Sequence, residues 1–320
     1  MSFIDADDVD ALKTLKSAHY NFPRAEKLRQ DMKWMITDYY AKSSLDQPFE
    51  ARGLVVTGPS RIGKSKEIRR LLTEVNDGST ILPDGRPAKI VTVVLKGLLT
   101  WKDLGIHTLT EGLKYPAEGR MTQREVWERV VWQAREQGVV GIHYDECQHV
   151  FPKVVSESRA MILDSFKSLL KQPEWPLMLI LSVINTLMDY INSEEQLAYL
   201  LRPVKFREIS TRAPNDLQEI NNICHAYAAK VELDVSKLAS RDFYQRLCCA
   251  CANRWGLVIE MIIDALIIAT QRGDGFVETA DFCQAFTHKA GLGAGYSPFS
   301  IDEYQSLFQE TQIFDLLSKK

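Results

Sequence analysis

The feature that most constrains this chain is the segment GPSRIGKS, which runs from Gly58 to Ser65 and fits the pattern G-x-x-x-x-G-K-[S/T] without mismatch. In this pattern the glycines let backbone N–H groups curl around a phosphate, and the helix that follows points its positive dipole end at the same place. The run before it, residues 49–57, predicts a strand, and residues 66–72 have helical spacing. Strand, glycine loop and helix therefore follow one another in the order that a phosphate-binding loop requires.

Two side chains of this loop have specific expected roles. Lys64 is placed to bridge the β- and γ-phosphates of a nucleotide, and the Ser65 hydroxyl to coordinate Mg²⁺. The alternative is an incidental glycine turn, against which the flanking strand and helix argue. The expected cofactors are ATP and Mg²⁺. The predicted nucleotide-binding residues of the loop are Gly58, Pro59, Ser60, Arg61, Ile62, Gly63, Lys64 and Ser65.

A second motif is the acidic pair Asp145-Glu146, which follows the apolar run VVGIHY. A carboxylate at the end of this predicted strand, Asp145, would join Ser65 in holding the metal. Glu146 would polarise the water that attacks the γ-phosphate. A solvated turn is the alternative for such a pair, and its position downstream of a phosphate loop favours catalysis. The two motifs predict a Mg²⁺-dependent ATPase that forms ADP and phosphate.

Other candidate metal ligands do not form a site in the sequence. His143 and His149 flank the acidic pair but do not have a recognised ligand spacing. We expect His143 to pack in the core and His149 to contact the acidic pair. The cysteines at 248–251 (CCxC) lie in a helical pattern and fit small buried residues better than a zinc site. The only metal expected is the Mg²⁺ of the nucleotide.

The order of predicted elements gives the fold class. Further strands at 89–95 and 177–184 alternate with helical segments, which predicts an α/β fold with a parallel sheet sandwiched by helices. After about residue 212 the strand signals stop. The expected domains are an N-terminal helical extension (1–47), a P-loop ATPase core (48–212), a small helical lid (213–290) and a flexible C-terminal tail (291–320).

Charge and hydropathy limit the partners and the location. The net charge is −3, so any nucleic-acid surface has to be a local basic patch or one built by assembly. The acidic N-terminus does not resemble a signal peptide. The most apolar run, 257–269, is interrupted by Glu260 and Asp264 at helical spacing, which indicates a buried helix. We expect a cytoplasmic protein that does not contact membranes.

Two further polar positions are candidates for catalysis. Asn185 follows the fourth predicted strand and would orient the attacking water, although Asn followed by Thr suits a helix N-cap equally well. Arg202 and Arg207 follow the next helical stretch. A guanidinium there can stabilise transition-state charge on a neighbouring subunit, and Arg202 is the preferred candidate over an ordinary surface role. The predicted catalytic set is Glu146, Asn185 and Arg202.

With these residues, the chain resembles the TniB/TnsC group of transposition ATPases, AAA+ proteins related in role to MuB and IstB. The resemblance runs from about residue 50 to 285. It is carried by the SR-x-GK core of the phosphate loop, by KDLGIHTLTEGLKY (102–115) and by EEQL…LLR (194–202). It implies the AAA+ (ASCE) form of the P-loop fold, with a C-terminal α-helical lid.

The resemblance also implies a function. Such proteins oligomerise as filaments or rings on double-stranded DNA without sequence specificity, and they recruit and activate a DDE transposase. ATP hydrolysis drives disassembly, and a target-selection protein is a further partner. By segment similarity, Lys102, Arg120 and Thr122 are candidates for DNA backbone contacts.

The chain departs from the family pattern at two places. His143 and Tyr144 stand where apolar residues usually precede the acids, and Leu257 stands where a sensor-2 arginine is expected. Arg254 is out of register for that role. The alternative function is a non-transposition AAA+ or STAND-type ATPase that switches protein partners in defence or signalling without DNA. A helicase or clamp loader is disfavoured because no helicase motif follows the acidic pair.

Overall fold

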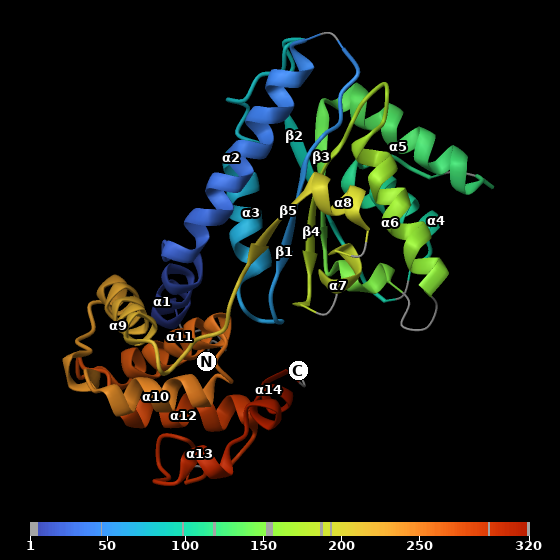
Figure 1. Ribbon diagram of the computed structural model, residues 1–320. Coiled ribbons are helices and arrows are strands. Elements are labelled where there is room, and N and C mark those ends of the chain that lie inside the picture. Colours follow the sequence, from blue (N-terminus) through green and yellow to red (C-terminus); the bar gives the residue numbers. More distant parts are fainter. Residues whose placement is uncertain are drawn as a thin grey trace. The chain divides into compact units, whose positions relative to one another are not determined.

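The computed structural model describes residues 6–45, 47–97, 99–117, 120–151, 156–185, 188–192, 194–293 and 295–318. Its contacts divide the chain into two compact units (Figure 1). The sheet unit is Phe22–Phe206, and the helical unit combines the residues up to Asn21 with Arg207–Lys320. The sheet unit carries both nucleotide-binding motifs.

The sheet unit is built on a five-stranded sheet of order β2-β3-β4-β1-β5 in which all neighbouring strands are parallel. Every residue of β1, β3 and β4 is buried, as is typical of parallel strands covered on both faces. The predicted parallel α/β sheet is thereby confirmed. The strands are β1 (Gly53–Thr57), β2 (Lys89–Val94), β3 (Val139–Asp145), β4 (Met178–Val183) and β5 (Leu201–Lys205).

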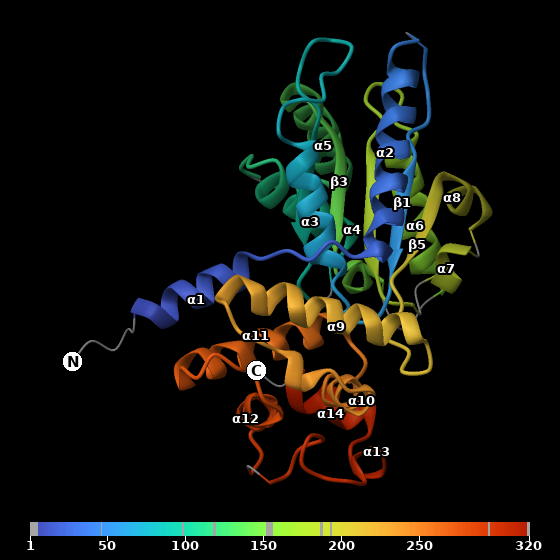
Figure 2. The ribbon, with the colours of Figure 1, turned by 90° about the vertical axis from the view of Figure 1, so that its left-hand side faces the viewer.

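Helices cover both faces of this sheet. In Figures 1 and 2, α2 and α3 lie on one face, and α5 and α6 lie on the other. Thr122 caps the start of α5 and Gly138 ends it in the left-handed region, so both ends are defined by sequence. The helices are α2 (Pro23–Ser43), α3 (Lys64–Val75), α4 (Trp101–His107) with the π-helical turn Thr108–Gly112, α5 (Gln123–Gln137), the 3-10 turn Cys147–Val150, α6 (Ser156–Leu170), α7 (Met188–Asn192) and α8 (Glu195–Leu200).

The helical unit is centred on α11, whose apolar face includes Val258, Ile262 and Leu266. This helix packs against α12, α9 and α1. None of the described helices is long and apolar enough to cross a membrane. The elements are α1 (Ala6–Ser17), α9 (Pro214–Ala228), α10 (Arg241–Ala250), α11 (Trp255–Arg272), α12 (Thr279–Ala290), α13 (Tyr304–Leu307) and α14 (Glu310–Ser318), with 3-10 turns at Ala229–Val231 and Ser236–Leu238.

The described residues near both ends of the chain belong to these two compact units. Helix α1 contacts α11, whereas α2 contacts β1 and β5, so the predicted extension 1–47 contributes to both units. We expected a flexible tail from residue 291, but the described part of this segment forms α13 and α14, and Phe308 and Ile313 are buried there. Apolar side chains at helical spacing account for this packing.

Candidate nucleotide-binding site

The phosphate-loop motif lies between the last residue of β1 and the first turn of α3. A Cβ atom at Gly58, where φ is 151°, would come within 2.5 Å of the carbonyl oxygen of Phe206. Gly63 precedes α3 with φ of 102°, in the left-handed region. Both positions therefore require glycine. Without side chains at these two positions, the loop backbone lies close to neighbouring atoms just before α3 begins.

Lys64 is the first residue of α3 and its side chain folds back over the loop. Its Nζ donates to the carbonyl oxygens of Gly58 at 2.6 Å and Pro59 at 2.9 Å, and the residue is buried. The ammonium group thus lies against the loop whose N–H groups would hold a phosphate. Phosphate oxygens would be stronger partners for it than neutral carbonyls, because both groups would then be charged.

Ser65 and Asp145 meet across a sequence separation of 80 residues. The Ser65 hydroxyl donates to Asp145 Oδ1 at 2.8 Å. Asp145 is the last residue of β3 and is 2 % exposed. Its other oxygen lies 3.6 Å from the guanidinium of Arg69, on the next turn of α3. A hydroxyl and a carboxylate are hard oxygen ligands, so this pair suits Mg²⁺ that also binds phosphate and water.

Glu146 follows at a sharp turn of the backbone. Its φ of 58° and ψ of 42° place a non-glycine residue in the left-handed region, which is uncommon and concentrates at functional sites. Its carboxylate accepts a hydrogen bond from the Gln148 side chain. Gln148 is a residue that the sequence reasoning missed, although its position two residues after Glu146 is within reach of a short turn. Its amide holds the Glu146 carboxylate in place.

His143 is fully buried, as expected, and also forms part of a polar row across three strands. Its Nδ1 lies 3.3 Å from Thr92 Oγ1 on β2, and its Nε2 lies 2.9 Å from Ser182 Oγ on β4. Burial lowers the pKa of His143 to about 4, and the nearby charge of Asp145 opposes this shift. The imidazole is therefore neutral at physiological pH and joins the strands on either side of β3. No hydrogen bond from the His149 side chain to the acidic pair is found among the described residues.

Asn185 lies just beyond β4, at the carboxyl edge of the sheet. The end of β4 pairs with the end of β1, where Val183 is opposite Thr57, so Asn185 belongs to the same edge as the phosphate loop. Its side chain is exposed. The N-cap alternative depends on residues 186 and 187, which lie outside the described residues.

Arg202 lies in β5, not at the carboxyl edge. It is opposite Leu54 of β1, and its guanidinium donates to Asp31 Oδ1 at 3.0 Å and stacks 3.5 Å from the centre of the Trp34 ring. Both partners are on α2, so Arg202 is held within its own subunit. Arg207 belongs to the helical unit, where its guanidinium donates to Asp216 Oδ1 at 2.6 Å. Within the sheet unit, the structure does not bring Arg202 to the Ser65–Asp145 pair.

The three candidates for DNA contact lie around α4 and the start of α5. Lys102 is half-buried in the first turn of α4. The pKa of Glu125 on α5 is lowered chiefly by hydrogen bonds from the Thr122 backbone and side chain, and to a smaller extent by the charge of Lys102. The Thr122 hydroxyl donates to Glu125 at 2.9 Å and accepts from its backbone, so it is engaged as a helix cap. Arg120 is exposed. The two helices are joined by Trp101 and Trp127, which stack at 4.3 Å.

Comparison with known proteins agrees with this geometry. A family model described as an AAA domain matches residues 47–191. A search of curated proteins finds no match. The family match includes the phosphate loop and the acidic pair.

Three solved structures share the fold. The Aeropyrum pernix ORC1 protein in complex with DNA has a TM-score of 0.62 at 15 % identity, covering 87 % of this chain and 69 % of that one. Cdc6p from Pyrobaculum aerophilum has a TM-score of 0.57 at 14 % identity, covering 85 % and 69 %. Drosophila ORC bound to DNA has a TM-score of 0.54 at 13 % identity, covering 89 % and 66 %. The chain therefore has the AAA+ P-loop fold with a helical C-terminal region. These matches do not single out the TniB/TnsC group among AAA+ proteins.

Proposed function

We propose that this protein is a Mg²⁺-dependent ATPase that assembles on double-stranded DNA and regulates transposition. The observation that carries the ATPase part of the proposal is the hydrogen bond between Ser65 and Asp145, with Glu146 next in the chain. Two motifs read separately from the sequence meet at one edge of the sheet. A hydroxyl, a buried carboxylate and a second carboxylate at that point are the groups that a phosphoryl-transfer site needs.

Each residue then has a defined part in hydrolysis. The loop from Gly58 to Ser65 binds the phosphates, and Lys64 neutralises charge on the β- and γ-phosphates. Ser65 and Asp145 would hold Mg²⁺, which would supply positive charge to offset the charge that develops on the phosphate oxygens. Glu146 takes a proton from the attacking water, and Asn185 orients that water from the end of β4.

The DNA-binding part of the proposal rests on three supports. The sequence resembles the TniB/TnsC group, the same fold occurs in ORC proteins solved with DNA, and Lys102 and Arg120 offer cations near one helix start. Glu125 and Glu128 lie on the same helix, so one subunit presents a mixed surface. Repetition of this surface in an oligomer would supply enough phosphate contacts for binding without sequence preference.

Recruitment of a transposase and of a target-selection protein is proposed from the resemblance. Arg202 is proposed to act on the nucleotide of a neighbouring subunit. Because Asp31 and Trp34 hold it in the single subunit, this role requires that assembly release the guanidinium. Hydrolysis at the subunit interface would then weaken the oligomer and free the DNA.

The test is association with random-sequence duplex DNA in the presence of ATP, ADP or a slowly hydrolysed ATP analogue, observed by negative-stain microscopy. We expect regular filaments or rings with ATP and the analogue only. Lys64→Ala is the control that removes a phosphate contact, and it should abolish ATP binding and assembly together. Wild-type ATP affinity in that variant would refute the loop assignment. Nucleotide binding without DNA association would instead favour a partner-switching ATPase.

A further inference from the structure

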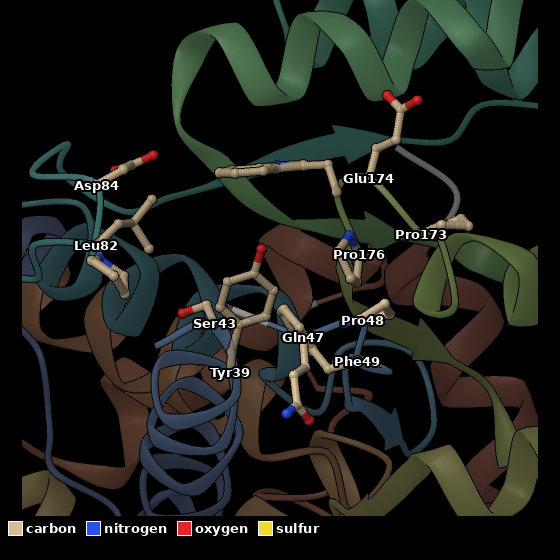
Figure 3. A pocket seen from close by; sticks show the side chains of 12 residues that line it. Tyr39, Ser43, Gln47, Pro48, Phe49, Leu82, Asp84, Pro173, Glu174 and Pro176 are labelled. Carbon is tan, nitrogen blue, oxygen red and sulfur yellow. The ribbon is translucent and has the colours of Figure 1, made fainter. Parts of the chain in front are cut away.

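A second candidate binding site lies in the sheet unit, away from the nucleotide-binding edge. A cavity of about 380 Å³ is lined by the end of α2 and by three loops (Figure 3). These loops lead into β1, β2 and β4, whereas Ser65 and Asp145 lie where strands end. Because the strands are parallel, the cavity is at the amino edge of the sheet and the nucleotide site is at the carboxyl edge. Occupation of one site leaves the other free.

The walls of the cavity are aromatic side chains and prolines in fixed positions. Tyr39 and Phe49 pack edge to face with ring centres 5.2 Å apart. Trp175 donates its indole N–H to the carbonyl oxygen of Val139 at 2.7 Å, and the Arg86 guanidinium lies 5.4 Å from its ring. The remaining rigid wall residues are Pro48, Pro83, Pro173 and Pro176. Such a wall loses little conformational entropy when it binds a ligand.

The Tyr39 hydroxyl is the first polar group available to an occupant. The residue is 3 % exposed, yet Figure 3 shows its hydroxyl pointing into the open space between Leu82 and Pro176. It makes no hydrogen bond to any residue in the described ranges. Burial, with the charge of Asp84, raises the pKa of Tyr39, so the phenol stays protonated. The hydroxyl is open to the cavity, so it can donate to or accept from an atom of an occupant.

The charge of the cavity indicates the chemistry of that ligand. The residues that line it include Asp84 and Glu174 and none of the described lysines and arginines, and Figure 3 shows the Glu174 carboxylate directed away from Tyr39. Asp84 is paired with Arg86, whereas Glu174 has no ion pair within the part of the chain that the structure describes. A planar cation fits best, because a guanidinium stacks on aromatic rings and also donates to a carboxylate and a phenol oxygen.

We propose that this cavity binds an arginine side chain carried by an extended segment of a partner protein. Pro48, Pro173 and Glu174 at its rim are exposed, so a chain can pass along the opening while one side chain enters. The guanidinium lies among Tyr39, Phe49 and Trp175 and donates to the Tyr39 oxygen, and the exposed Glu174 side chain turns toward it to accept a second hydrogen bond. A partner bound in this way stays attached through nucleotide binding and hydrolysis at the opposite edge.

The experiment titrates the full-length protein with a terminally blocked peptide, Ser-Pro-Arg-Pro-Ser, whose prolines keep the arginine extended. The indole N–H signal of Trp175, assigned with Trp175→Phe, reports binding by two-dimensional NMR. We expect saturation with a dissociation constant of about 0.1–1 mM. The same peptide with citrulline, which has the same shape without the charge, should bind at least roughly tenfold more weakly. A peptide with leucine should be weaker still.

Two conservative variants test the site. Tyr39→Phe removes only the hydroxyl and Glu174→Gln only the charge, and each should weaken binding roughly three- to tenfold. Glu195→Gln, at an exposed glutamate of α8, is the matched control and should bind like wild type. Unchanged ATP affinity would show that each variant is folded. The proposal is overturned by no response at about 5 mM arginine peptide, by equal binding of the citrulline or leucine peptide, or by unchanged binding in both variants.

Discussion

Two non-glycine residues beside the nucleotide site have positive φ angles, Arg61 at 61° and Glu146 at 58°. Such conformations cost on the order of 1–3 kcal/mol each and persist where surrounding structure enforces them. At Glu146 the backbone N–H donates to Asp145 Oδ1 at 3.1 Å, and the Gln148 side chain holds the Glu146 carboxylate. This positioning is set before a nucleotide binds, which favours a role for Glu146 in the reaction itself.

Glu146→Gln is expected to bind ATP with near wild-type affinity and to lose hydrolysis by roughly 10²–10⁴-fold. The amide has the same shape as the carboxylate but cannot accept a proton from water. Steady-state phosphate release measures the loss, and a fluorescent nucleotide measures the affinity. On DNA, the variant should accumulate in the assembled state.

Glu195→Gln, the exposed glutamate of α8, serves as the control for the change of charge. Wild-type turnover by Glu146→Gln would exclude Glu146 as the base. Loss of ATP affinity in the same variant would indicate that the residue supports the loop instead of the attacking water.

The sequence predicts site residues that belong to a motif of fixed spacing. It does not predict site residues whose contacts depend on which strands are neighbours in the sheet. The loop around Lys64 is set by local backbone requirements, so its pattern is visible in the chain. The contacts of His143 with Thr92 and Ser182 exist because β3 lies between β2 and β4. The order of strands in the sheet is a tertiary feature, and the position of a histidine within an apolar run of the sequence does not predict it.

Strand β5 was not predicted from the sequence. Its sequence LRPVK contains Pro203 and alternating exposed positions, which do not resemble the apolar runs of the other strands. The sheet order makes β5 an edge strand, where proline is tolerated and one side remains unpaired. Arg202 therefore points from an edge strand to α2. The helix and the strand hold each other through a charged and an aromatic contact.

The role of Arg202 can be separated from its contact with α2. We expect Arg202→Ala to lower the ATPase rate of the DNA-assembled protein by roughly 10³-fold or more, as for arginines that act in trans, and to leave the basal rate of dilute monomer unchanged. Asp31→Asn keeps the guanidinium but weakens the pair that holds it. It should retain assembled activity.

The two variants give opposite results under the two explanations. If Arg202 only ties β5 to α2, Arg202→Ala and Asp31→Asn should both lower the unfolding temperature, and neither should affect assembled turnover selectively. An equal loss of activity in monomer and oligomer would also argue against action on a neighbouring subunit. Rates and melting curves for both variants therefore decide the role.

At the scale of the whole molecule, the sequence predicts the change from strands to helices along the chain. It does not predict to which of the two units the N-terminal and C-terminal segments belong. Helix α1 packs on α11 and α2 packs on the sheet, although both lie in the single helical extension predicted for residues 1–47. Similarly, Tyr304 and Phe308 pack in the helical unit although a glycine-rich segment precedes them. The amphipathic pattern of a helix indicates that one face is buried, but it does not indicate which unit of the protein covers that face.

DNA binding is proposed for the assembled oligomer, so it is tested at the scale of the whole molecule. The double variant Lys102→Gln, Arg120→Gln should weaken binding to duplex DNA equally for different sequences and flatten its salt dependence. Each cation lost from a phosphate contact lowers the slope of log affinity against log salt by about 0.9. Its ATPase rate without DNA should equal that of wild type, because neither residue makes a hydrogen bond or ion pair with the phosphate loop or the acidic pair in the described ranges.

Arg124→Gln is the matched control, because Arg124 is an exposed cation of α5 that is paired with Glu128 at 2.6 Å. It removes one positive charge close to Arg120 in the chain, whereas the double variant removes two, so a general effect of net charge would appear in it at a smaller size. A smaller slope in the double variant alone would place DNA at the start of α5. Equal slopes in the double variant, Arg124→Gln and wild type would show that DNA binds to another surface of the oligomer, whereas reduced slopes in both would show long-range attraction without a defined contact.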